Sequence, residues 1–402
     1  MTEAQTLFSR RVAAERESPG RVLLVEDGES RIALAAARGL RTAGWQVSVA
    51  TPQMSHASIS RYTMHRYVIR RLEQDPVGFR QDVTAAISHG GQDLVFGVGD
   101  AEVLALSAAR DDFEACLPYP EHACVVAAID KVQLTAAARS AGLSTPAVYS
   151  SPAQVGPRES VIVKPRLNGR VGHRGTTKIE ARLAKGAVDA ARMAAGVTAA
   201  GGEPLIQAAV QGDLLALILL IVPDGRVIAA VQQRADRLYP PHVGISARSH
   251  TESVDAGLER RAVQMLSALG WWGVAELQFV MPDNGEPVLI DLNGRFYGSL
   301  SLALAASVNF PDLWARSALG LPTPVRTEAR PGVRYQWLEG DLRRALVARD
   351  GGLLRDVACC FAAAPSCHHS MSSLQDPVPA LRQASRLARS AVASRLAGLS
   401  AT

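Results

Sequence analysis

The chain has 402 residues, of which 48% are hydrophobic and 20% are charged, so it holds enough apolar material for two or three globular domains. Its formal net charge of +5 is spread thinly, and no basic block with interleaved aromatic residues occurs, so the composition argues against nucleic acid as a partner. The longest apolar run, 214–222, is about half of the roughly 20 residues that a membrane-spanning helix needs, and it predicts a buried strand.

The N-terminal 18 residues carry charges throughout and lack the apolar centre of a signal peptide, so we expect a cytoplasmic protein with no membrane partner. The cysteines are odd in number and form no repeated CxxC pair, which does not suggest a disulfide framework. The cluster of Cys359, Cys360 and Cys367 with the following histidines matches no strong zinc spacing, and ordinary packing is its more frequent role.

The first part of the chain has a strand–helix–strand pattern. Residues 21–25 predict a buried strand, 30–43 a helix that ends at Gly44, and 45–50 a second strand, which together form a parallel, right-handed unit. A further strand at 93–98 precedes a helix that begins near Asp100. The block from about 20 to 120 therefore predicts a Rossmann-like domain, but no GxGxxG motif follows its first strand, so it is not a dinucleotide site.

Two lysines mark the next region. Lys131 precedes a predicted helix at 132–141, and Lys164 ends a predicted strand that leads into the glycine-rich run 168–175. Such a loop can fold over phosphates with its backbone N–H groups, although a solvated turn is the more common role of a glycine-rich run. Only four of the 43 basic residues are lysines, so a lysine here is a better candidate than usual for a position that needs an ammonium group.

The segment 276–295 predicts a hairpin with one polar face. If Asn284 and Gly285 form a two-residue turn, Gln278 lies opposite Asp291 and Glu276 lies opposite Asn293. The alternate residues are apolar and should point to the core: Leu277, Phe279, Ile290 and Leu292. A solvated strand face usually carries Thr, Lys and Arg, whereas carboxylates and amides supply the oxygen atoms that a hard cation such as Mg²⁺ accepts.

The tail from about 326 onward predicts helices. Its arginines at 382, 386, 389 and 395 alternate with apolar residues at roughly helical spacing. Because the apolar stripe is weak, we expect the last helix to cover the protein's own surface or a partner subunit rather than a membrane.

Taken in chain order, these pieces resemble the ATP-grasp superfamily, most closely its carboxylate-amine ligase type. The resemblance rests on Asp130-Lys131, Lys164 with its glycine-rich loop, the segment 205–213, the Glu276-x-Gln278 strand, and Asp291-x-Asn293-x-Arg295. It covers about residues 20–325. It implies a Rossmann-like pre-ATP-grasp domain at 20–120, a two-subdomain ATP-grasp domain at 121–325, and a mainly helical C-terminal extension at 326–402, so an α/β and α+β fold.

The resemblance also implies roles for particular residues. Lys131 and Lys164 would hold the phosphates of ATP, and Gln207, Ala208 and Val210 would face the adenine, with Asp213 near the ribose or the substrate. Gln278, Asp291 and Asn293, with Glu276 beside them, would hold one or two Mg²⁺ ions, or Mn²⁺ in their place. Arg295 would hold a substrate carboxylate or acyl phosphate, a task that suits a guanidinium fork, and Arg237 is a second candidate for phosphate charge. The catalytic group implied in this way is Arg295, Lys164 and Arg237.

The activity implied is ATP-dependent coupling of a small carboxylate, activated as an acyl phosphate, to an amine, with amino acids or peptide-like acids as the default substrates and a homodimer as one possible assembly. The sequence departs from the usual pattern, because Gln278 and Asp291 stand where glutamates are usual and Ala208 where an acid is common. Two alternatives therefore stay open: a non-catalytic nucleotide-binding protein, and an ATP-grasp enzyme that carries out carboxylation or phosphoryl transfer to another acceptor.

Overall fold

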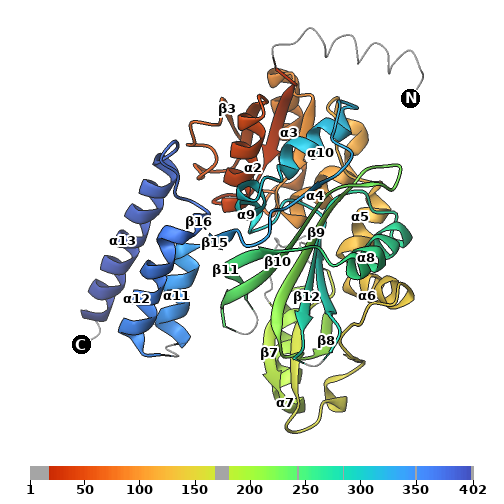
Figure 1. Ribbon diagram of the computed structural model, residues 1–402, viewed down its shortest axis with the longest axis vertical. Coiled ribbons are helices and arrows are strands. Elements are labelled where there is room, and N and C mark those ends of the chain that lie inside the picture. The colour runs from red at the N-terminus through yellow and green to blue at the C-terminus, as the bar shows by residue number, and fades with distance from the viewer. Residues whose placement is uncertain (1–17, 168–180, 242–243, 284, 349–350, 400–402) are drawn as a thin grey trace.

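The computed structural model describes residues 18–167, 181–241, 244–283, 285–348 and 351–399, with three sheets in succession along the chain (Figure 1). The glycine-rich run 168–175, expected to close over phosphates, lies outside the described residues.

The first sheet is parallel and has the strand order β3-β2-β1-β4. Its strands are β1 (Arg21–Val25), β2 (Gln46–Thr51), β3 (His65–Val68) and β4 (Leu94–Gly97). Its helices are α2 (Arg31–Thr42), α3 (Pro76–Gly90) and α4 (Asp100–Ala108), followed by the short turn η1 (Arg110–Asp112). The Ser30 hydroxyl caps α2 by accepting the N–H groups of Ile32 and Ala33. The predicted parallel strand–helix–strand unit is confirmed.

In this sheet β2 and β3 lie on one side of β1 and β4 lies on the other, so the strand order reverses at β1. Open parallel sheets bind ligands at such a switch point, outside the carboxyl ends of the strands. The switch point here lies between the ends of β1 and β4.

The second sheet is small and has the order β5-β8-β6-β7. It is reached through α5 (His122–Ile129) and α6 (Lys131–Ser140), and α6 starts where the Asp130 carboxylate accepts the N–H groups of its first turn. The strands are β5 (Val148–Tyr149), β6 (Ser160–Pro165), β7 (Arg182–Lys185) and β8 (Pro204–Ala208), with η2 (Pro152–Gln154) and α7 (Gly186–Ala199) against them. Buried valines and alanines of these elements form a core of their own.

The third sheet is the largest, with the order β13-β12-β9-β10-β11-β15-β16 and β14 paired to β10. Its strands are β9 (Asp213–Ile221), β10 (Val227–Tyr239), β11 (Ile245–Glu252), β12 (Gly273–Met281), β13 (Val288–Asn293), β14 (Thr327–Glu328), β15 (Arg334–Gln336) and β16 (His368–His369). The predicted buried strand 214–222 is β9, and it is central because an almost wholly apolar strand must be covered on both faces. The helices that follow these strands are α8 (Ala256–Ala268), α9 (Leu300–Ala305) and α10 (Phe310–Ala318).

The β12–β13 hairpin keeps the predicted register only near its site end. Glu276 pairs with Asn293 and Gln278 with Asp291, but a bulge then shifts the register, so Phe279 pairs with Leu289. The predicted two-residue turn is wrong, since residues 282–287 connect the strands, and Asn284 itself lies outside the described residues. Ile290 is also wrong as a core residue, because it is half-buried and Leu289 is buried in its place.

The tail contributes both helices and strand partners. Its helices are α11 (Leu338–Ala348), α12 (Leu353–Ala363), η3 (Ala364–Ser366) and α13 (Val378–Leu399), and they stand beside the sheets at the left of Figure 1. The segments β14, β15 and β16 join the large sheet, so the tail is less separate than a mainly helical extension would be. Among the described residues no helix is long and apolar enough to cross a membrane.

A buried carboxylate fastens the tail to the first sheet's helices. Asp376 is 1% exposed, and it accepts hydrogen bonds from Arg38 Nε at 3.0 Å, the Ser60 hydroxyl at 2.8 Å and the Arg61 backbone N–H at 3.1 Å. Arg382 and Arg386 of α13 add ion pairs to Glu29 in the loop after β1.

We expect Asp376→Ala to lower the free energy of unfolding by about 3 kcal/mol, because it leaves the largely buried Arg38 guanidinium without its carboxylate. Urea denaturation measures this, and limited proteolysis should show faster cleavage in the tail. Asp224→Ala is the matched control, since its ion pair with Arg226 is exposed and should contribute less than about 1 kcal/mol. Equal losses in the two variants would contradict the anchoring role.

Candidate functional site

The polar face of the β12–β13 hairpin brings its four predicted side chains together. Asn293 Nδ2 donates a hydrogen bond to Glu276 Oε2 at 2.8 Å, and Gln278 Nε2 donates to the same oxygen at 3.3 Å. Glu276 is 5% exposed and Asn293 is 9% exposed, whereas Gln278 and Asp291 are half-buried. The polar square predicted from the sequence is therefore present, with Glu276 at its buried end.

Two lysines from other elements reach this square. Lys131, the first residue of α6, is 3% exposed and forms an ion pair with Asp291. Lys164, near the end of β6, donates through Nζ to the Ile290 carbonyl oxygen at 2.9 Å. That carbonyl lies at the bulge in β13, so the irregularity that breaks the predicted register supplies the acceptor for the second lysine.

The charges in this cluster depend on one another. Burial alone would raise the pKa of Asp291, but the positive charges of Lys131 and Lys164 outweigh it and lower that pKa. Burial lowers the pKa of Lys164 to about 8, although Asp291 opposes the shift. Burial raises the pKa of Glu276 to about 7, against the opposing effect of Arg295. At neutral pH Asp291 is therefore the fixed negative charge, while Glu276 is close to its titration point.

The oxygen atoms of the square fit a hard divalent cation. Within the described part of the chain no three His, Cys, Asp or Glu side chains converge as metal ligands, and here the amides of Gln278 and Asn293 would complete the set with Asp291. Gln278 Oε1 has no hydrogen-bond partner among the described residues, so it is available to a cation. Glu276 would join once it loses its proton.

Arg295 connects this square to the first sheet. Its Nη2 donates to Asn293 Oδ1 at 2.9 Å, and its Nε donates to Asp100 Oδ1 at 2.6 Å. Asp100 is the first residue of α4, directly after β4. The guanidinium group therefore spans from the hairpin to the switch point of the parallel sheet.

Two buried acids lie at that switch point and were missed in the sequence. Glu26 follows β1 and is 1% exposed, and Glu102 lies in the first turn of α4 and is 5% exposed. Burial raises the pKa of Glu26 to about 8 and that of Glu102 to about 7. Glu26 accepts a hydrogen bond from the Ser55 hydroxyl through Oε1, while its buried Oε2 has no partner in the described structure. The available signal was that Glu26 directly follows a predicted buried strand.

The residues of the segment 205–213 that were expected near the adenine and the ribose differ in burial and in hydrogen bonding. Gln207 is 4% exposed on β8, and the Ala208 N–H already donates to the Ala147 carbonyl at 2.8 Å, so it is not free for a base. The Val210 backbone makes no hydrogen bond to another described residue. Asp213 is exposed and lies 3.6 Å from Arg234 in an ion pair.

Arg237 is not brought to the cluster by any contact in the described structure. Its Nη1 lies 3.3 Å from Asp341 Oδ1 of α11, and Asp341 is fully buried. A bulge in β10 between Ala235 and Arg237 puts Arg237 opposite Arg248 of β11, which binds the same carboxylate. The Arg237 guanidinium, which the resemblance suggested as a group that neutralises phosphate charge, therefore holds the tail to the large sheet.

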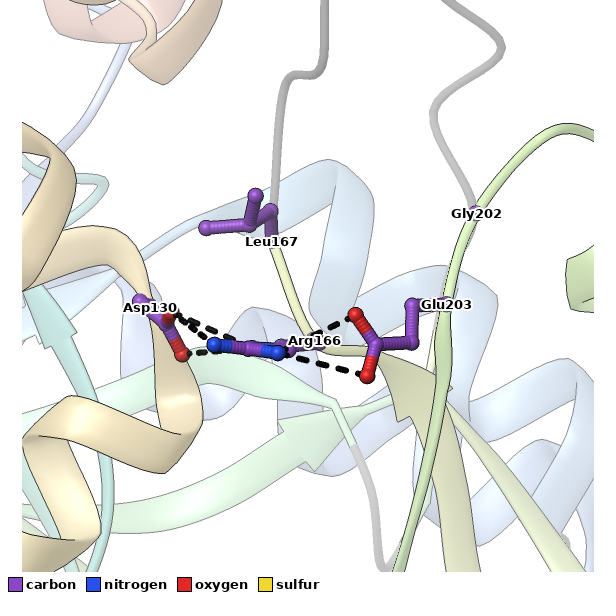
Figure 2. A pocket seen from close by; sticks show the side chains of 5 residues that line it. All are labelled: Asp130, Arg166, Leu167, Gly202 and Glu203. Atoms are coloured by element: carbon purple, nitrogen blue, oxygen red, sulfur yellow. Dashed lines mark hydrogen bonds and ion pairs between the residues drawn. The ribbon is translucent and has the colours of Figure 1, made fainter.

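A small pocket of about 220 Å³ lies beside the start of α6, where Leu167 and the segment that precedes β8 meet (Figure 2). Its lining residues are Asp130, Arg166, Leu167, Gly202 and Glu203. Arg166 lies between two acids, 2.8 Å from Asp130 and 3.2 Å from Glu203. Because Asp130 also caps α6, Arg166 helps to fix the helix start that carries Lys131.

The sequence and the fold of this chain were compared with those of known proteins. Residues 219–341 match a family described as ATP-grasp in the biosynthetic pathway with the Ter operon. The solved biotin carboxylase of Campylobacter jejuni is similar over 78% of this chain and 74% of that chain, with a TM-score of 0.60 and 15% identity. The chain has the ATP-grasp fold.

Two further solved structures are similar to this chain over most of their length. N5-carboxyaminoimidazole synthetase of Staphylococcus aureus matches 84% of this chain and 86% of that chain, with a TM-score of 0.61 and 10% identity. An L-amino acid ligase of Bacillus licheniformis matches 79% of each chain, with a TM-score of 0.59 and 15% identity. No curated protein sequence matches the chain. The ATP-grasp fold predicted from the sequence is thereby confirmed, while the carboxylate-amine ligase type stays a prediction.

The buried acids predict a pH effect on the stability of the protein. A carboxyl group whose pKa is raised by folding stabilises the protein below its unfolded value, near 4.5, and that contribution is lost as the pH rises through the folded value of about 7. We therefore expect Glu102→Gln to become more stable relative to the wild type by roughly 2–3 kcal/mol between pH 5 and pH 8.

Chemical denaturation at several pH values measures this difference. Glu114→Gln, at an exposed glutamate of the same sheet region, is the control and should show no such trend. A constant difference between Glu102→Gln and the wild type across this range would contradict the burial argument.

Proposed function

We propose that this chain is an ATP-dependent enzyme that activates a small carboxylate as an acyl phosphate and couples it to an amine. The observation that carries the proposal is the convergence of Lys131, Lys164 and Asp291 beside the oxygen atoms of the hairpin. Two cations and a fixed carboxylate at one point suit a triphosphate with its divalent cation better than any other common ligand.

In this proposal the lysines hold phosphate oxygens of ATP. Among the described residues Lys164 donates to a single carbonyl oxygen, and the Lys131 ammonium can rotate between Asp291 and a phosphate. Gln278, Asp291, Asn293 and the deprotonated form of Glu276 would hold Mg²⁺, which when bound neutralises charge on the transferring phosphoryl group. Gln207, the Ala208 carbonyl group and the Val210 backbone would face the adenine. The Ala208 N–H group would not, because it already donates to Ala147. Asp213 would lie near the ribose.

Arg295 would hold the carboxylate or the acyl phosphate. Its contacts to Asn293 on the hairpin and to Asp100 on α4 support a position between the proposed phosphate end of the site and the switch point. The buried acids Glu26 and Glu102 lie on that side, where an amine substrate would gain from a negative charge when they lose their protons. Arg237 has no part in the proposal, because its contacts are to the tail.

The chemistry needs positioning and charge rather than a protein nucleophile. The substrate carboxylate oxygen attacks the γ-phosphorus, ADP leaves, and the resulting acyl phosphate is attacked at carbon by the amine, which releases phosphate. Lys164 and Arg295 would stabilise negative charge on the transferring group. Carboxylation, or phosphoryl transfer to another acceptor, is the second candidate, since the fold alone is shared by carboxylases and an amino acid ligase.

We expect Lys164→Ala and Asp291→Ala each to abolish ATP turnover, because each removes a charge from the phosphate and metal end of the site. The assay measures ADP and phosphate release with Mg²⁺ over a panel of amino acids and small acids, and mass spectrometry identifies the products. An amide product with equal amounts of ADP and phosphate supports the ligase. A carboxylated or phosphorylated product supports the second candidate, and full activity in either variant contradicts the site.

Nucleotide affinity should also fall at alkaline pH. The Lys164 ammonium is charged below its pKa of about 8 and loses its proton above it, so the dissociation constant for ADP with Mg²⁺ should rise by up to about tenfold between pH 7 and pH 9. Lys164→Arg, whose guanidinium stays charged, should bind with little pH dependence over the same range. Equal pH profiles for the two proteins, measured by calorimetry, would contradict a phosphate role for Lys164.

A further inference from the structure

A second pocket, of about 590 Å³, lies at the far edge of the large sheet from the hairpin. It is bounded by β10, β11 and β15 and by the end of α12 with η3. Among the described residues that line it are Asp236, Arg248, His250, Arg334 and Cys367.

Strand register places this pocket on the opposite face of the sheet from the candidate nucleotide site. Directly paired residues share a face, and the pairs Gln278 with Ala216, Ala216 with Gln233 and Gln233 with Thr251 carry the hairpin's polar face across to β11. His250 is the neighbour of Thr251 and therefore points the other way. The pocket is thus distinct from the site at Lys131 and Lys164.

The same register gathers the basic side chains. His250 lies directly opposite Arg334, and Arg248 lies two residues from His250 on the same face of β11. Asp236 is the only acid among the pocket's lining residues, and its Oδ1 is 2.8 Å from His250 Nδ1. Two guanidinium groups therefore face the pocket against one carboxylate that histidine already engages.

Both guanidinium groups have donors to spare. Arg248 binds the buried Asp341 through Nε, but its buried Nη2 has no hydrogen-bond partner in the described structure. Asp341 is shared with Arg237, so one carboxylate faces two arginines. The exposed Arg334 side chain makes no ion pair with any described residue. The partly exposed Arg248 and the exposed Arg334 are therefore the two cationic side chains that an oxyanion in the pocket would meet.

We propose that this pocket binds a small oxyanion, a phosphate or a carboxylate, between Arg248 and Arg334. A guanidinium fork accepts the oxygen pair of either group, so the two share one recognition chemistry. The proposal does not depend on the function proposed for the hairpin site, because it uses none of that site's residues.

Cys367 provides a local readout, since it lines the pocket. The full-length protein is alkylated with iodoacetamide at pH 8.5, because burial raises the pKa of the Cys367 thiol. Inorganic phosphate and succinate are titrated separately, with sodium chloride at matched ionic strength as the reference. Peptide mass spectrometry compares Cys367 with the partly buried Cys124 of α5, which does not line the pocket.

We expect one or both anions to slow alkylation of Cys367 in a saturable way and to leave Cys124 unaffected. Protection by phosphate or by succinate alone supports the site and names its ligand. In Arg334→Gln the anion concentration for half-protection should rise about tenfold, while Arg158→Gln, at an exposed arginine elsewhere without an ion pair to a described residue, should match the wild type. Lack of saturable protection by either anion, or equal protection in Arg334→Gln, would overturn the proposal.

Discussion

The ion pair between Lys131 and Asp291 joins the start of α6 to the end of the β12–β13 hairpin, and the charge balance of the candidate site follows from it. Asp291 stays ionised in a buried position because Lys131 and Lys164 face it. A buried carboxylate without those cations would take up a proton, and the hairpin would offer no fixed negative charge to a metal. Asp130 and Arg166 secure this contact, since they fix the helix start from which Lys131 projects.

A second set of charged contacts connects the ATP-grasp elements to the parallel sheet. Arg295 extends from the hairpin to Asp100 at the start of α4, and the tail binds the same sheet through Asp376 and through Arg382. These contacts hold the switch point of the parallel sheet beside the hairpin. The buried Glu102 then lies within electrostatic reach of the Arg295 guanidinium, and Glu26 lies close enough to Glu102 for their charges to interact.

The sequence predicts correctly those features that depend on a local pattern, such as the alternation of side chains along a strand. The period of two along 276–279 and 291–293 predicted the shared polar face, and the strand–helix–strand pattern predicted the parallel sheet. The partners of Gln278 and Glu276 are also as predicted, although the two-residue turn from which they were predicted is wrong. The prediction failed where a single residue interrupts the period. The bulge in β13 turned Ile290 away from the core. Arg237 was a candidate from the resemblance alone, and the bulge in β10 puts it opposite Arg248. The roles of Glu26 and Glu102 depend on β4 lying beside β1, which no local pattern reveals.

Calorimetric titration of the full-length protein with ADP, in the presence of Mg²⁺ and again in EDTA, tests the central claim most directly. We expect one nucleotide per chain and tighter binding with Mg²⁺, because the lysines would hold the phosphates and the hairpin oxygens would hold the cation. Undetectable binding, or the same affinity with and without Mg²⁺, would contradict a metal-nucleotide site at this hairpin.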